Sequence, residues 1–186
     1  MVGFEGGTYR HSLQPADVTV AEVLQDADYS TGLFGKWGLA VHDQPGIPNN
    51  KGFEEFAGYL NQRKAHNYYP PYLWHNRQKF DLPGNLGHDH TQPNQYDEDG
   101  RIIPNGVDDP DQAAYSFDHY AEKSLDFVRD HAGDPFFLYL AYTIPHAAFE
   151  VPHLGPYARE DWPLTHKVYA AMVTRMDSAI GRLLDL

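Results

Sequence analysis

Cysteine is absent from the 186-residue chain, and basic residues and long apolar runs are scarce. Without cysteine these residues form no disulfide and no zinc–thiolate site, and they contain no cysteine nucleophile. Fourteen Lys and Arg stand against 26 Asp and Glu, for a formal net charge of −12, which argues against nucleic acid or an anionic membrane as a partner. No apolar run is long enough to span a bilayer. A small anionic substrate would therefore need a local basic pocket.

The chain does contain enough apolar material for a sizeable core, with 41% hydrophobic and 14% aromatic residues. This length and composition are typical of one globular domain or part of a larger one, and we treat residues 1–186 as a single domain. The first residues, Met-Val-Gly-Phe-Glu-Gly-Gly, lack the basic and apolar regions of a signal peptide. They give no indication of the compartment.

Helical and strand patterns alternate along the chain. A capping box in Thr19–Glu22 predicts a helix over residues 20–27, and the apolar run from Ser30 to Phe34 predicts a core strand. Helical spacing recurs over residues 115–131, and Phe136 to Tyr142 has the near-continuous apolar character of a strand covered on both faces. This alternation predicts an α/β fold with a mostly parallel sheet flanked by helices.

A last helix is predicted over residues 167–186 from its apolar spacing. No glycine cap, proline or polar tail follows it, so we expect the chain to be cut where another strand would follow.

Lys36 and His146 each follow a predicted strand. Ligands of an open parallel sheet bind beyond the carboxyl ends of its strands, so both side chains are expected at the same rim. A fixed cation beside a group that titrates near neutral pH suits an anion site. Considered alone, each could instead be an ordinary surface residue that ends a strand or lies in a loop.

The segment from residue 59 to residue 112 is predicted to make a long excursion over the surface. Its first part, residues 59–74, mixes aromatic and amide side chains, which suit a sugar or aryl ligand but also commonly pack a long loop. Further on, His88-Asp89-His90 could supply two metal ligands or form a solvated turn, and the solvated turn is the more common outcome.

Five blocks of this sequence resemble the type I sulfatases, the arylsulfatase A-like branch of the alkaline phosphatase superfamily, in that family's order and spacing. The blocks are Asp17–Leu24, Thr31–Trp37, Gly52–Tyr59, Pro135–Pro152 and Tyr169–Gly181. The resemblance implies a partial alkaline-phosphatase-like three-layer sandwich and the hydrolysis of sulfate esters of small molecules or glycans. Members of that family are usually periplasmic, secreted or lysosomal, and an export signal would lie upstream of these residues, which leaves the compartment unknown.

The resemblance further implies roles for four residues. The family counterpart of Lys36 contacts the nucleophile and a sulfate oxygen, and that of His146 donates a hydrogen bond near the leaving oxygen. Asn61 and His66 fall in a region that lies near the substrate pocket in a bacterial subgroup, which makes them candidate substrate-binding residues.

Two parts of the family's active site are expected outside this chain. The nucleophile is a formylglycine made from the cysteine, or sometimes serine, of a C-x-P-S-R motif, and calcium is held by an early Asp pair and a later Asp-Asn pair. No metal ligand is therefore assigned here, and residues 1–186 are expected to be an inactive central fragment. Missing strands would expose the edges of the sheet, which favours self-association.

The sequence also departs from the family pattern. Gly38 stands where many members have a histidine, and Ala40 replaces a usual glycine. Two alternatives to the sulfatase interpretation stay open: a phosphodiesterase or phosphonate hydrolase of the same superfamily, and a non-catalytic remnant that binds an anion without cleaving it.

Overall fold

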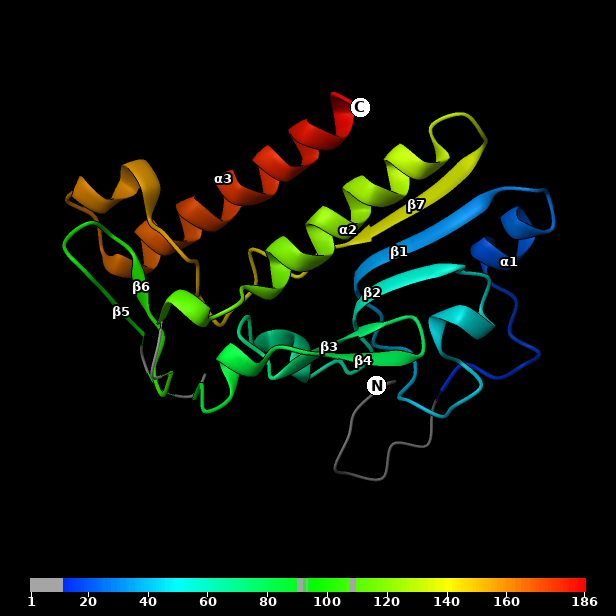
Figure 1. Ribbon diagram of the computed structural model, residues 1–186, viewed down its shortest axis with the longest axis horizontal. Helices are drawn as coiled ribbons and strands as arrows, with labels where there is room; N and C mark the ends of the chain where they lie inside the picture. Colours follow the sequence, from blue (N-terminus) through cyan, green and yellow to red (C-terminus); the bar gives the residue numbers. More distant parts are fainter. Residues whose placement is uncertain (1–11, 90–91, 93, 108–109) are drawn as a thin grey trace.

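A mixed sheet forms the centre of the computed structural model, which describes residues 12–89, 92, 94–107 and 110–186. The five strands lie in the order β4-β3-β2-β1-β7 (Figure 1). Strands β2 (Glu55–Tyr59), β1 (Ser30–Lys36) and β7 (Phe136–Ala141) run parallel, while β3 (Tyr72–His75) and β4 (Gln78–Asp81) form an antiparallel hairpin. The predicted α/β class, with a mostly parallel sheet flanked by helices, is confirmed.

Successive side chains of the central strands enter two different hydrophobic clusters. Leu33 and Phe56 belong to one cluster, whereas their neighbours Phe34 and Ala57 belong to the other. Side chains alternate between the two faces of a strand, so each cluster covers one face of the sheet.

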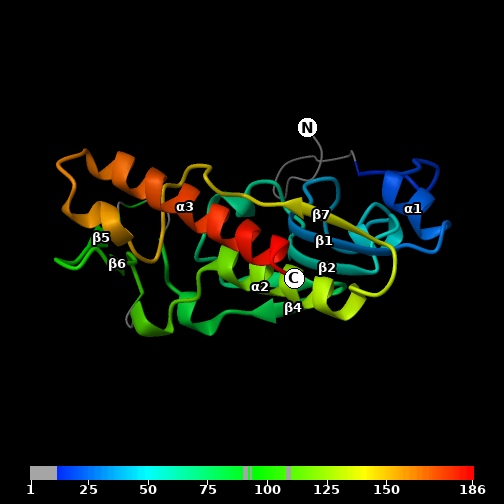
Figure 2. The ribbon, with the colours of Figure 1, turned by 90° about the horizontal axis from the view of Figure 1, so that it is seen from above.

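The described residues form three α-helices: α1 (Val20–Gln25), α2 (Ser116–His131) and α3 (Leu164–Leu184). Of these, α1 and α2 contact the strands of the sheet. Helix α2 lies along one face and α1 along the other (Figure 2). The predicted capping box is present, since Thr19 N donates to Glu22 Oε2 at 2.8 Å and Glu22 N donates to Thr19 Oγ1 at 3.2 Å. All three predicted helices are found, with ends shifted by up to three residues.

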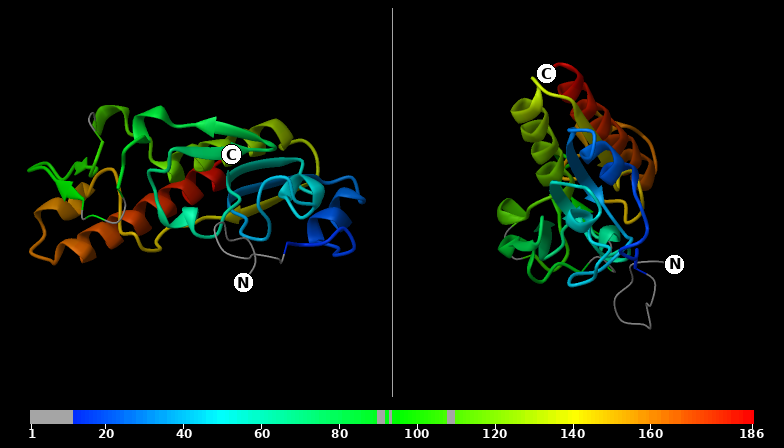
Figure 3. Two further views of the ribbon diagram at one scale, coloured as in Figure 1. Left: turned by 90° about the horizontal axis from the view of Figure 1, so that it is seen from below. Right: turned by 90° about the vertical axis from the view of Figure 1, so that its right-hand side faces the viewer.

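Helix α3 packs beside α2 (Figure 3). Arg175 forms a bidentate ion pair with Asp118, and Arg182 forms a bidentate ion pair with Glu122. None of the described helices is both long and apolar enough to cross a membrane.

Strand β7 corrects one expectation. Its apolar run was expected to be covered on both faces, yet Phe136 and Tyr139 are 36% and 48% exposed. The reason is that β7 lies at the edge of the sheet and pairs only with β1 among the described residues. The edge predicted to favour self-association is thus exposed, and self-association itself stays a prediction.

The segment 59–112 is only partly the surface excursion that its composition predicts. Its β3–β4 hairpin extends the central sheet, and β5 (Gln95–Tyr96) pairs with β6 (Ile102–Ile103) in a small second sheet. Strand β2 was not predicted, because its apolar run is short. Five 3₁₀ turns complete the described structure, at Pro48–Asn50, Lys64–His66, Pro83–Asn85, Pro110–Gln112 and Gly155–Arg159.

Candidate active site at the carboxyl rim of the sheet

The carboxyl ends of β1 and β7 lie side by side. The strands are parallel, and Gly35 is opposite Ala141, so Lys36 and the loop after β7 emerge at the same rim, as predicted. Gly35 has a φ of +121°, and a Cβ there would lie 2.1 Å from the Ala141 carbonyl oxygen. A glycine is therefore required immediately before Lys36 for the two strands to end this close together.

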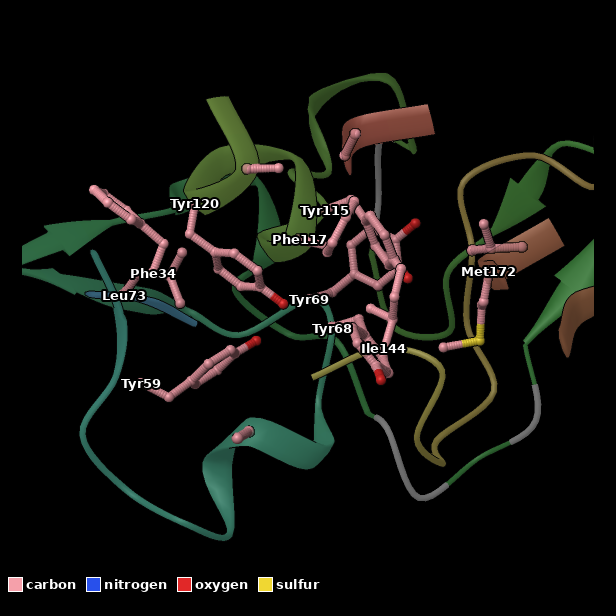
Figure 4. Close-up of a cluster of buried hydrophobic side chains, with 14 of the residues drawn as sticks. Phe34, Tyr59, Tyr68, Tyr69, Leu73, Tyr115, Phe117, Tyr120, Ile144 and Met172 are labelled. Atoms are coloured by element: carbon pink, nitrogen blue, oxygen red, sulfur yellow. The ribbon is translucent and has the colours of Figure 1, made fainter. Parts of the chain in front are cut away.

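Buried Tyr68 ties the loop after β7 to the turn that follows β2. Its hydroxyl lies 3.0 Å from the Thr143 carbonyl oxygen and 2.9 Å from that of His146. Burial raises the pKa of Tyr68, so the hydroxyl keeps its proton and donates it to these acceptors. A backbone hydrogen bond of 3.3 Å from Ala148 N to His66 O joins the same two segments. In Figure 4 Tyr68 lies beside Ile144 of that loop.

The imidazole rings of His66 and His146 stack on each other, with centroids 4.6 Å apart and planes inclined by 15°. They line an open hollow of about 540 Å³ together with Arg63, Ala147 and Ala148. None of the described residues that line this hollow is acidic. In a chain of net charge −12, this is a local basic surface of the kind that an anionic substrate needs.

The other two candidate residues have different surroundings. Asn61 is buried, and its Oδ1 accepts hydrogen bonds from Arg63 N at 2.8 Å and Lys64 N at 3.1 Å, so it fixes the turn that carries Arg63. Partly buried Lys36 sits opposite Tyr59 in the β1–β2 ladder and is not among the described residues lining the hollow of His146. Substrate binding by Asn61 and sulfate contact by Lys36 stay predictions.

His88 does not lie in the solvated turn that its sequence favours. Its side chain is buried, with Nε2 3.2 Å from Glu150 Oε1 and Nδ1 3.1 Å from the Asn105 carbonyl oxygen. His90, the other histidine of that motif, lies outside the described residues. Among the residues described, no three His, Cys, Asp or Glu side chains group together to hold a metal ion. The described residues thus do not form a site for the calcium that the resemblance implies.

Sequence reasoning missed Arg63 and Glu150. Arg63 could have been noticed, because Arg63-Lys64 lies just before His66 in a chain poor in basic residues. Glu150 left no such signal. It is 2% exposed and accepts hydrogen bonds from Tyr68 N at 3.2 Å and Asn94 Nδ2 at 2.9 Å, besides its contact with His88. Glu150 thus joins the loop that carries His146 to the segments of Tyr68, His88 and Asn94.

The arrangement of sheet, rim and basic hollow can be compared with known proteins. The family model described as Sulfatase matches residues 3–186. This chain belongs to the sulfatase family. Arylsulfatase J of Mus musculus is 30% identical over 166 residues, which cover 88% of this chain and 25% of that protein. Arylsulfatase G of Homo sapiens is 30% identical over 186 residues, covering 91% of this chain and 32% of that protein.

Solved sulfatase structures share the fold. The crystal structure of Ps i-CgsB in complex with k-i-k-neocarrahexaose has a TM-score of 0.72 and 22% identity, covering 99% of this chain and 39% of that one. The resemblance to sulfatases of alkaline-phosphatase-like fold is thereby confirmed. This sulfatase chain spans a quarter to a third of the length of the two curated relatives named above.

Proposed function

We propose that this chain is the central part, 1–186, of the catalytic domain of a sulfatase that hydrolyses sulfate esters of small molecules or glycans. The formylglycine nucleophile and the calcium ligands come from residues outside it, so the chain alone does not turn over. The observation that supports this most strongly is the basic hollow around His146, at the rim where a sheet of this kind binds its ligands.

Lys36 supplies a fixed positive charge in this proposal. Sulfuryl transfer concentrates negative charge on the non-bridging and leaving oxygens, so a cation held at the rim stabilises the transition state more than the ground state. Its position immediately after Gly35 at the end of β1 keeps the backbone of Lys36 in a defined place.

His146 acts on the leaving oxygen. Its Nδ1 lies against the carbonyl oxygen of Ala147, which holds a proton on that nitrogen. The other ring nitrogen, Nε2, is then the one that donates a proton to the departing alkoxide or phenoxide when the ring is charged. Stacking on His66 and the hydrogen bond from Tyr68 to the His146 carbonyl restrict the ring and its backbone.

Sulfate release by the complete enzyme tests this assignment. Lys36→Ala and His146→Ala are expected to lower kcat by about 10²- to 10⁴-fold, the range for loss of a positioned proton donor or transition-state charge partner. Lys123→Ala and His166→Ala are matched controls, because they remove the same residue types from α2 and α3, and are expected to leave kcat within about threefold. Unchanged turnover in both rim variants would show that the site is assigned wrongly.

A phosphate diester and a phosphonate ester assayed in parallel separate the related reactions. Faster release of the phosphorus product than of sulfate would assign the chain to a phosphodiesterase or phosphonate hydrolase. A complete protein that binds sulfate esters but cleaves none would instead be an anion-binding remnant.

A further inference from the structure

A second hollow adjoins the one that holds His146. It measures about 380 Å³ and is lined by Arg63, Lys64, Asn67, Tyr72 and His88 together with two prolines. Arg63 belongs to the walls of both hollows. A single exposed arginine therefore stands between the space assigned to the sulfate ester and a neighbouring space of similar size.

The second hollow is basic as well. Arg63 and Lys64 are both exposed, and none of the described residues that line it is an aspartate or glutamate. The Lys64 ammonium is held at its wall, because Nζ donates to the Tyr72 hydroxyl at 2.6 Å and lies 4.8 Å from the centre of that ring. Two adjoining hollows without a carboxylate are unexpected by chance on a protein with nearly twice as many acidic as basic residues.

The turn that presents Arg63 is fixed from several sides. Asn61 Oδ1 accepts from the Arg63 and Lys64 amides, and His66 N donates to Arg63 O at 3.1 Å. The buried Tyr59 hydroxyl donates to the Asn67 carbonyl at 2.6 Å, which anchors the far end of the turn. A backbone held in this way loses little conformational entropy when a ligand binds. Less of the favourable free energy from the side-chain charges is therefore offset by ordering of the turn.

Building on the proposed function, we propose that Arg63 is a specificity-determining residue that binds a second anionic group of the substrate. The sulfate to be cleaved occupies the hollow of His146, and a sulfate or carboxylate on the neighbouring sugar occupies the second hollow. The planar guanidinium suits either group, because it donates two parallel hydrogen bonds to a pair of anionic oxygens. The preferred substrate is then an oligosaccharide with at least two anionic groups, and not a simple aryl sulfate, which fills only the first hollow.

Kinetics of the complete enzyme on matched substrates test this proposal. The set comprises 4-nitrophenyl sulfate, a monosulfated disaccharide, and the same disaccharide with either a second sulfate or a uronate carboxylate on the neighbouring ring. Arg63→Ala is expected to lower kcat/KM for a dianionic substrate about 10- to 100-fold, mainly through KM, since a charged hydrogen bond contributes that much. Arg63 also lines the hollow of His146, so the two monoanionic substrates are expected to lose some kcat/KM as well, but clearly less than the dianionic ones. The dianionic substrate whose kcat/KM falls further in Arg63→Ala shows whether the second group that Arg63 binds is a sulfate or a carboxylate.

Two further variants control the experiment. Arg63→Lys keeps the charge but not the paired donors, and an intermediate loss on the dianionic substrates is expected. Arg129→Ala removes an arginine that lines neither hollow and is expected to change no substrate selectively. An equal loss on monoanionic and dianionic substrates in Arg63→Ala, or no loss on either, would overturn the proposal.

Binding measurements separate this proposal from the proposed function. If the unmodified enzyme released no sulfate from any substrate, the proposed function would fail, and calorimetric titration with the dianionic disaccharides would still decide the role of Arg63. A selective loss of affinity for these ligands in Arg63→Ala supports the second site, and unchanged affinity excludes it.

Discussion

Two stacked histidine pairs in this protein have nearly the same ring geometry and different surroundings. The rings of His66 and His146 are 4.6 Å apart at 15°, and those of His75 and His119 are 4.7 Å apart at 17°. The first pair lines an open hollow beside Arg63. The second pair joins β3 to α2, where Phe80 stacks on both rings at 4.7 and 4.5 Å.

Burial gives the second pair a structural role. Desolvation, the like charge of His75 and that of Lys123 together lower the pKa of His119 to about 4, and desolvation followed by Lys123 lowers the pKa of His75. Both rings are therefore neutral near pH 7, and their Nε2 atoms lie 2.6 Å apart as one donor and one acceptor. Stacked rings alone do not mark a site. A basic, open hollow at the carboxyl rim distinguishes the first pair from the second.

Buried polar contacts of Glu150 help to hold the loop that carries the first pair, and Glu150→Ala tests this with the largest expected effect. The substitution removes the buried acceptor of Tyr68 N, His88 Nε2 and Asn94 Nδ2, so the free energy of unfolding is expected to fall by about 3 kcal/mol or more. Urea denaturation measures the change. Glu150→Gln, which keeps the volume and one acceptor oxygen, is expected to lose clearly less. Equal losses in both variants would mean that the carboxylate contributes little as an acceptor.

The second pair is expected to weaken the fold as the pH falls. The unfolded chain takes up a proton near pH 6.5, whereas folded His119 resists protonation until about pH 4, so stability is lost as the pH falls between these values. His119→Phe retains the stacking and removes this titration. The free energy of unfolding of the variant minus that of the unmodified protein is therefore expected to rise by about 2 kcal/mol as the pH falls from 7 to 4. This figure allows for the partial exposure of the ring.

Urea unfolding at several pH values measures that difference. His166→Phe, at an exposed position on α3, is the matched control and should show almost no pH-dependent gain. A pH-independent difference for His119→Phe would show that the second pair is not held neutral by burial.

The sequence predicted what is local and missed what is long-range. The start of α1 could be predicted because its capping box, Thr19–Glu22, lies within four consecutive residues. Strand β4 was not predicted because all of its residues are exposed and only one of them, Phe80, is apolar. One apolar residue makes no alternating pattern. The run in β7 predicts a strand, but whether a strand lies at an edge depends on its neighbours, which no local pattern reports.

The candidate site follows the same division. The positions of Lys36 and His146 after two apolar runs predicted the shared rim, because parallel strands end on one side. Stacking of His146 on His66 was not predictable. It depends on Tyr68, whose hydroxyl reaches a carbonyl 78 residues further along the chain, and on a buried carboxylate with no sequence signal.

Tyr68→Phe gives the smallest expected effect on stability and separates the two histidine pairs most directly. Removing the hydroxyl deletes the hydrogen bonds to the Thr143 and His146 carbonyls, and the free energy of unfolding is expected to fall by about 1 kcal/mol. Proton NMR of the imidazoles should show changed shifts for His66 and His146. The chemical shifts of His75 and His119 should remain unchanged, because their contacts with Phe80 do not involve Tyr68. Matching changes in both pairs would contradict the view that separate contacts hold them.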